Sequence, residues 1–204
     1  MVSRLRCFIG GILFCFFSSS FALHATENDD LVKAMMEVYA EELAANPQDY
    51  RTYYSRAMAY FGQGDMKKAL SDIDNAIKYF PRKEKDDLAQ AYLLRAKILS
   101  ERGETKSALT DLNSALRLVP NHRLALKDRG DLLCRLGQYD MAKIDYNHLL
   151  RMDTRSQSAF MGLARVEAHT GQPVRAKDLL AQAVNLSPKD PKIYLERSEI
   201  YKET

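Results

Sequence analysis

The stretch YLLRAKILSERGETKSALTDLNSALRLVP, residues 92–120, contains two apolar stripes separated by Gly103. On each side of the glycine, apolar residues recur at steps of three and four. The stripes consist of Tyr92, Ala96 and Leu99, and of Ala108, Leu112, Ala115 and Leu116. This spacing places each stripe on one face of a helix, and Pro120 cannot continue a helix. The stretch therefore predicts two antiparallel helices joined by a tight turn at the glycine.

The same pattern recurs along the chain. The turn glycines are 39, 34 and 34 residues apart, an alanine follows each after five residues, and a small residue precedes each by seven. The three columns are Gly64, Gly103, Gly137 and Gly171; Ala69, Ala108, Ala142 and Ala176; and Ala57, Ala96, Gly130 and Ala164. Small residues let paired helices cross closely. A fixed period of this length indicates a tandem array whose helix pairs stack to bury their apolar faces.

The 34-residue period, the small-residue columns, the turn glycine and the terminal proline resemble the tetratricopeptide repeat. The resemblance implies an all-α fold, a right-handed α-solenoid of helix-turn-helix repeats. Four full repeats fit within residues 50–190, at 50–82, 89–122, 123–156 and 157–190. Five extra residues near Arg82 to Asp87 should lengthen a helix or loop between the first two repeats.

Both ends of the array resemble caps. An additional helix is expected within residues 26–49, with Asp29 and Asp30 capping its amino end. Residues 191–204 repeat only the first helix of a unit, and we expect a polar outer face there. The predicted packing face of this last helix consists of Tyr194, Ser198 and Tyr201. With the four repeats, about ten helices are expected.

Residues 1–25 have the order of a secretory signal peptide. Arg4 and Arg6 precede an apolar run of 11 residues, and small residues follow at Ala22 and Ala25. A membrane span needs about 20 apolar residues, so we expect cleavage near Ala25 or Ala22 rather than an uncleaved anchor. The mature chain is then expected to be periplasmic or secreted. Membrane contact would come only through the signal segment, if it is not cleaved.

The charge balance argues against a general polyanion binder. The chain has 30 basic and 27 acidic residues, and removal of the two signal-segment arginines leaves 28 against 27. A chain so close to neutral has no bulk electrostatic attraction to nucleic acid or an anionic membrane surface. We therefore expect no nucleic-acid partner.

Charged residues form a second pair of columns. In three repeats an arginine is followed by an aspartate sixteen residues later, and in the fourth repeat both positions are leucine. The pairs are Arg56 and Asp72, Arg95 and Asp111, Arg129 and Asp145, and finally Leu163 and Leu179. A joint change from charged to apolar predicts that the two positions are neighbours across a helix pair. A ladder of arginines for an acidic ligand is the functional alternative.

Residues typical of catalysis or metal binding are sparse in the mature chain. Its histidines, His122, His148 and His169, lie in different repeats without metal-ligand spacing. Its one cysteine, Cys134, is interpreted as a small buried residue, with pairing to another chain as the alternative. Cys134 and His148 could meet as nucleophile and base, but tandem helix pairs bring such residues close by chance. We expect no enzyme activity, no metal and no cofactor.

The family resemblance implies that the first helices of the repeats line a concave groove that binds peptides or partner helices. Helical geometry then selects the candidate groove residues. They are Arg51, Tyr54, Met58, Phe61, Gln90, Leu93, Lys97, Leu124, Lys127, Asp131, Cys134, Ser158, Met161 and Arg165. This surface is expected to be apolar near the amino terminus and increasingly cationic beyond it. Packing of Tyr54, Met58 and Phe61 against the preceding helix is an equal alternative.

The sequence is therefore interpreted as an exported, non-enzymatic scaffold or adaptor that binds a peptide or helix of a partner protein in its concave groove. The alternative is an accessory or regulatory subunit of an envelope assembly, secretion or enzyme complex. A structural oligomer built by end-to-end stacking is a third interpretation. The oligomeric state and the partner's identity stay open.

Overall fold

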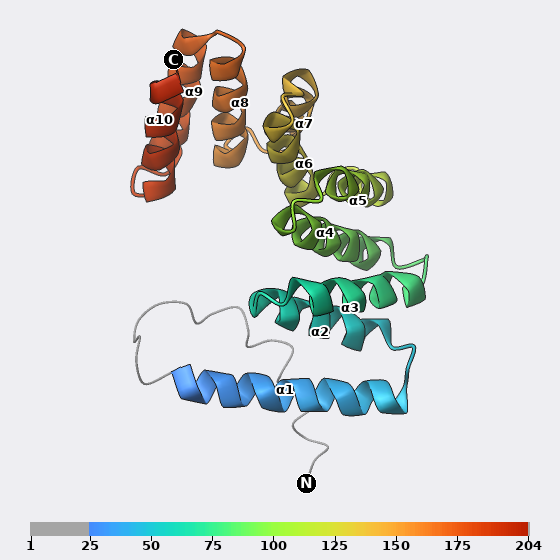
Figure 1. Ribbon diagram of the computed structural model, residues 1–204. Coiled ribbons are helices and arrows are strands. Elements are labelled where there is room, and N and C mark those ends of the chain that lie inside the picture. Colours follow the sequence, from blue (N-terminus) through green and yellow to red (C-terminus); the bar gives the residue numbers. More distant parts are fainter. Residues whose placement is uncertain (1–24, 204) are drawn as a thin grey trace. The chain divides into compact units, whose positions relative to one another are not determined.

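The computed structural model describes residues 25–203, which form ten helices and no strand (Figure 1). The helices are α1 (Ala25–Ala45), α2 (Tyr50–Gly62), α3 (Met66–Tyr79), α4 (Lys85–Glu101), α5 (Thr105–Leu118), α6 (Arg123–Arg135), α7 (Tyr139–Met152), α8 (Gln157–His169), α9 (Pro173–Leu186) and α10 (Pro191–Glu203). The predicted all-helical class and helix number are confirmed for this part of the chain. The predicted signal peptide, apart from Ala25, lies outside the described residues.

The chain divides into two units at Glu42, and each unit is described by itself. The first contains most of α1, which begins at Ala25. Asp29 and Asp30 therefore lie inside this helix, and the prediction that they cap its amino end is wrong. Residues 25–30 contain neither glycine nor proline, so nothing in their sequence stops the helix before Asp30.

In the second unit, consecutive helices pack as the pairs α2 with α3, α4 with α5, α6 with α7, and α8 with α9 (Figure 1). The turn within each pair contains one of the predicted glycines, with φ between 71° and 79°. Residues with a Cβ rarely adopt this left-handed conformation, so glycine ends the first helix and reverses the chain. The five-residue insertion extends α4 to 17 residues, against 13 for α2, α6 and α8.

The small-residue columns lie where the helices approach most closely, and all eight of their members are buried. A larger side chain, at one equivalent position in the second helix of each pair, packs beside these small residues. This position holds Ile73, Leu112, Tyr146 and Leu180, all at most 2% exposed. Stacked helix pairs with a continuous buried core constitute an α-solenoid.

Tyr146 is the bulkiest residue of this series, and two glycines make room for it. Its ring lies beside Gly130 of α6 and Gly162 of α8, where an added Cβ would be 2.8 Å and 2.3 Å from ring atoms. A glycine inside a helix costs roughly 0.5–1 kcal/mol relative to alanine. Here the cost is offset by complete burial of an aromatic ring between two repeats.

The predicted charge pairs are confirmed. Each arginine donates from Nε and Nη2 to the two carboxylate oxygens of its aspartate, at 2.6–2.8 Å. In the fourth pair, Leu163 is buried and Leu179 packs against the same apolar cluster. Arg95 and Arg129 also donate to Asp74 and Asn113. These guanidinium groups are engaged within the fold, which argues against an arginine ladder for a ligand.

The predicted packing face of α10 is wrong. Tyr194, Ser198 and Tyr201 are exposed, whereas Ile193 is fully buried and Arg197 is half-buried. In complete repeats the first helix packs against the second helix of its own pair, and no helix follows α10 among the described residues. The face with Tyr194, Ser198 and Tyr201 therefore stays in solvent, while α10 contacts α8 and α9 and Ile193 is buried.

Replacement of Gly162 by alanine is expected to destabilise the protein by about 1–3 kcal/mol, because the new Cβ would overlap the Tyr146 ring. Urea denaturation measures the change. Gly62→Ala is the matched control: nothing lies within 4 Å of the place its Cβ would occupy, so stability should be unchanged or rise by up to about 1 kcal/mol. Equal effects of the two substitutions would contradict the proposed close packing.

Candidate functional site

The first helices α2, α4, α6 and α8 carry the candidate groove residues on their outward side. Arg51, Met58, Gln90 and Leu124 are exposed. Tyr54, Phe61, Lys97, Lys127, Asp131, Ser158, Met161 and Arg165 are half-buried. Their accessibility agrees with a surface role, whereas partner binding at these positions stays a prediction. Tyr54 and Phe61 also pack against the apolar cluster of α2, α3 and α4.

Two of the candidate residues do not belong to the surface. Leu93 is 3% exposed and Cys134 is 6% exposed, and both lie in the main apolar cluster. Their assignment to the groove is therefore wrong. α4 packs against α3 and α5 and has buried residues on most of its sides. Leu93 therefore points into the core. Cys134 is covered next to Tyr146, as expected for a small buried residue.

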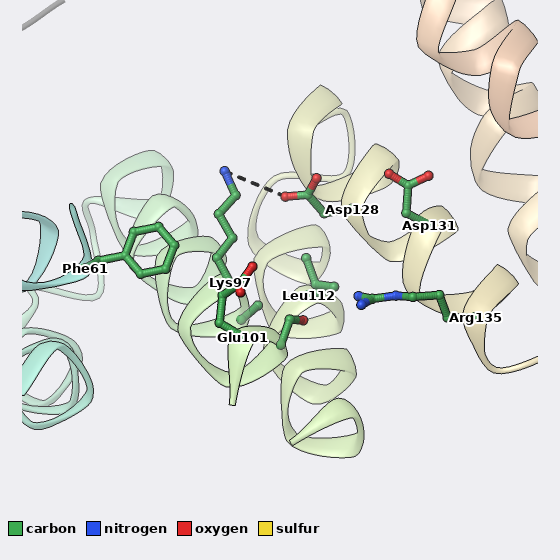
Figure 2. Close-up of a pocket in the computed structure, with 9 residues that line it drawn as sticks. Phe61, Lys97, Glu101, Leu112, Asp128, Asp131 and Arg135 are labelled. Carbon is green, nitrogen blue, oxygen red and sulfur yellow. Dashed lines mark ion pairs between the residues drawn. The ribbon is translucent and has the colours of Figure 1, made fainter. Parts of the chain in front are cut away.

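A hollow of about 330 Å³ opens between α2, α4 and α6 (Figure 2). It is lined by Phe61, Ala96, Lys97, Ser100, Glu101, Leu112, Asp128, Asp131 and Arg135. Phe61 and Arg135 approach it from opposite sides, with Lys97 and Asp128 between them (Figure 2). Phe61, Lys97 and Asp131 were predicted for this surface from the repeat pattern. Glu101, Asp128 and Arg135 were not predicted, although each follows a predicted groove residue by four positions and so shares its helix face.

Asp131 is the centre of a polar network beside this hollow. Its Oδ1 accepts from Tyr146 Oη at 2.7 Å and from Arg165 Nη1 at 3.1 Å, while its Oδ2 accepts from Lys127 Nζ at 2.7 Å. The donors come from α6, α7 and α8, so one carboxylate connects two repeats. Lys127 and Arg165 both pair with Asp131, and Lys97 lies 3.8 Å from Asp128. These two carboxylates offset part of the positive charge of the three basic residues, so the groove is less cationic than the sequence pattern indicated.

The network shifts the pKa values of its members. Burial alone would raise the pKa of Asp131, but the hydrogen bond and charge of Lys127, with Tyr146 and Arg165, lower it overall. Burial would lower the pKa of Lys127, whereas the hydrogen bond and charge of Asp131 raise it overall. Burial, followed by the charge of Asp131, raises the pKa of Tyr146. Asp131 and Lys127 are therefore both charged at neutral pH, and Tyr146 is a neutral hydrogen-bond donor.

Cys134 and His148 have different neighbours within residues 25–203. Cys134 Sγ lies 3.8 Å from Tyr146 Oη, and burial raises the pKa of the thiol. His148 instead contacts Asn121 Oδ1 through Nε2 at 2.9 Å. The suggested meeting of Cys134 and His148 as nucleophile and base is therefore wrong.

The part of the chain that the structure describes offers neither a metal centre nor a membrane span. Within it, no group of three or more histidine, cysteine, aspartate or glutamate side chains has the arrangement of a metal site. None of the helices in residues 25–203 combines the length and apolar character needed to cross a bilayer.

Comparisons with known proteins agree with this architecture. The family model "Tetratricopeptide repeat" matches residues 36–87, 54–123, 93–142 and 127–191, so the chain belongs to the tetratricopeptide repeat family. Among curated proteins, no relative matches it in sequence.

Solved structures show the same fold. A tetratricopeptide repeat protein from Parabacteroides merdae is 27% identical, with a TM-score of 0.76 over 87% of this chain and 68% of that one. MamA is 17% identical, with a TM-score of 0.70 over 87% and 99% of the two chains. YrrB, described as having an unusual peptide-binding site, is 19% identical, with a TM-score of 0.69 over 85% and 86%.

Asp131→Asn is expected to destabilise the protein by roughly 1.5 kcal/mol at neutral pH, because it removes a charged hydrogen-bond acceptor. The lowered pKa of Asp131 means that its contribution is fully present above the ordinary aspartate pKa of about 3.9 and is lost as pH falls through the folded-state pKa. Urea denaturation of both proteins from pH 7 to pH 3 should therefore show a difference that shrinks below about pH 4.

The matched control is Asp140→Asn, because Asp140 is exposed at the start of α7 with no recorded ion pair among the described residues. This substitution should change stability by no more than about 0.5 kcal/mol. A difference between wild type and Asp131→Asn that persists unchanged to pH 3 would contradict the lowered pKa.

Proposed function

We propose that this protein is an exported, non-enzymatic scaffold that binds a peptide or helix of a partner protein along the outward face of its first helices. The hollow between α2, α4 and α6 is the observation that carries the proposal. It is open to solvent, lies on the face predicted from the repeat pattern, and mixes apolar and charged walls. Such a mixture suits a segment of polypeptide, whose side chains alternate in character.

Exposed apolar side chains extend this surface beyond the hollow. Met58 is 48% exposed and occupies in α2 the position that Lys97 and Asp131 occupy in α4 and α6. Leu124 is 51% exposed and precedes Asp131 by seven residues, two helical turns along the same face of α6. Burial of these two side chains by a partner would supply affinity that the paired charges cannot.

The non-enzymatic part of the proposal is supported by the chemistry of the site. Tetratricopeptide repeat proteins are generally scaffolds, and Asp131, Lys127 and Arg165 are held in mutual ion pairs. The raised pKa of Cys134 keeps its buried thiol protonated at neutral pH, whereas the thiolate is the reactive form. YrrB, a structural neighbour, is described as having an unusual peptide-binding site, which supports peptide recognition on this fold.

Mutation of the exposed apolar groove residues is expected to weaken partner binding. Affinity purification from a cell-envelope fraction would identify a partner, and fluorescence anisotropy would measure its binding. Met58→Glu with Leu124→Glu should raise the dissociation constant at least about tenfold, since each loses apolar burial. The matched control is Met141→Glu with Ile144→Glu on α7, whose side chains are 55% and 63% exposed. Equal losses in both double variants would reject the groove as the binding site.

Export rests on the charged, apolar and small-residue order of residues 1–25. When the full chain is expressed in a Gram-negative host, we expect it in the periplasmic fraction with Thr26 or Leu23 as its first residue. Mass spectrometry of the purified protein distinguishes the two cleavage sites. Recovery of the protein in the cytoplasm with residues 1–25 attached would contradict export.

A further inference from the structure

The carboxylates around the hollow differ in how well their hydrogen-bonding capacity is met. Asp131 accepts from three side chains at 2.7–3.1 Å. Asp128, one turn earlier on α6, is less well satisfied: its Oδ2 is buried and receives no hydrogen bond from residues 25–203. The nearest cations are Lys97 Nζ, 3.8 Å from Oδ2 (Figure 2), and Lys127 Nζ, 3.5 Å from Oδ1.

These distances place both ammonium groups beyond good hydrogen-bond range of Asp128. A buried acceptor without a donor destabilises the fold, and more so when the acceptor is charged. Two other buried side-chain atoms of the described chain lack a hydrogen bond, His122 Nε2 and Glu167 Oε1. Neither lines the hollow, and Glu167 Oε1 lies 2.7 Å from Lys143 Nζ. Asp128 is therefore the wall residue that gains most from an added donor.

The remaining walls suit a side chain that is apolar along its stem and cationic at its tip. Phe61, Ala96 and Leu112 supply apolar surface for the stem. Glu101 is exposed on the hollow and has no recorded ion pair within residues 25–203. A volume of about 330 Å³ is at the lower end of ligand pockets, which suits one long side chain.

The two basic residues of the hollow do not favour an anion over a cation. Arg135 is exposed, so its charge is met by solvent, and Lys97 is 42% exposed and can turn outward from its long contact with Asp128. An entering anion would meet Glu101 and Asp128, which line the same hollow as Lys97 and Arg135. An entering cation would instead meet the carboxylate whose acceptor is unsatisfied.

We infer that the hollow between α2, α4 and α6 accepts one lysine or arginine side chain of the bound partner segment, with Asp128 as its acceptor. The inference rests on the proposed peptide-binding function and specifies the chemistry of the partner. It differs from the expectation that this surface becomes increasingly cationic.

A library of random twelve-residue peptides displayed on phage, selected against the purified full-length protein, tests this inference. Peptides with a shared lysine or arginine are expected, and the best binder is then measured by fluorescence anisotropy. Asp128→Asn should weaken binding at least about tenfold, the effect of losing one charged hydrogen bond. Replacement of the peptide's arginine by citrulline, or of its lysine by norleucine, should cause a similar loss without changing the protein.

A double-mutant cycle then shows whether the two groups interact directly. Asp128→Asn should have little further effect on the uncharged peptide, because the interaction is already absent. Asp140→Asn, the matched control, should leave binding of both peptides unchanged, and circular dichroism should show equal helical content in all variants.

The other outcomes separate this inference from the proposed function. Selected peptides that carry no shared cation, or that bind Asp128→Asn as tightly as wild type, would overturn the inference and leave peptide binding intact. Acidic peptides whose binding is lost in Arg135→Gln would replace it with an anion site. Failure to select any peptide would count against the proposed function and the inference together.

Discussion

The close approach of the two helices in each pair is the constraint on which the structure depends. The contact positions hold Ala57 and Ala69 in the first repeat, and alanine or glycine in the other repeats. All of these residues are buried, because no larger side chain fits there. With the helices this close, the left-handed glycine completes the turn and the arginine-aspartate pairs can reach across. The first helix then keeps only one face free, and that face carries the hollow.

At one position, the junction between the third and fourth repeats has an ion pair where the preceding junction has leucine side chains. Leu109 packs against the cluster that contains Leu133, and the equivalent positions one repeat later are Lys143 and Glu167, paired at 2.7 Å. Arg165 also crosses this junction to Asp131. Ion pairs at such positions add little net stability compared with leucine, but each requires its partner in one place.

The repeat spacing predicted the helices, the turn glycines and the arginine-aspartate contacts because each depends on positions within one repeat. The residues that were misassigned depend on neighbouring repeats. Leu93 is buried because of what surrounds α4, and Tyr194 is exposed because α10 has no following helix among the described residues. Likewise, Asp131 pairs with basic residues of two repeats, which a residue-by-residue count of charge could not show. The repeat period determines on which face of its helix a residue lies. Its contacts with residues of other repeats can be determined only from the structure.

Some columns of equivalent positions maintain the fold, and others are available to contact a partner. The alanine that follows each turn glycine is the same in all four repeats, whereas the outward column holds Met58, Lys97, Asp131 and Arg165. A buried column must keep its size, since any added methyl group would push the helices apart. An outward column has no such constraint, so it can differ in every repeat while its position stays fixed. A bound segment would therefore meet a different side chain at each step, and the order of these side chains would determine which segment fits.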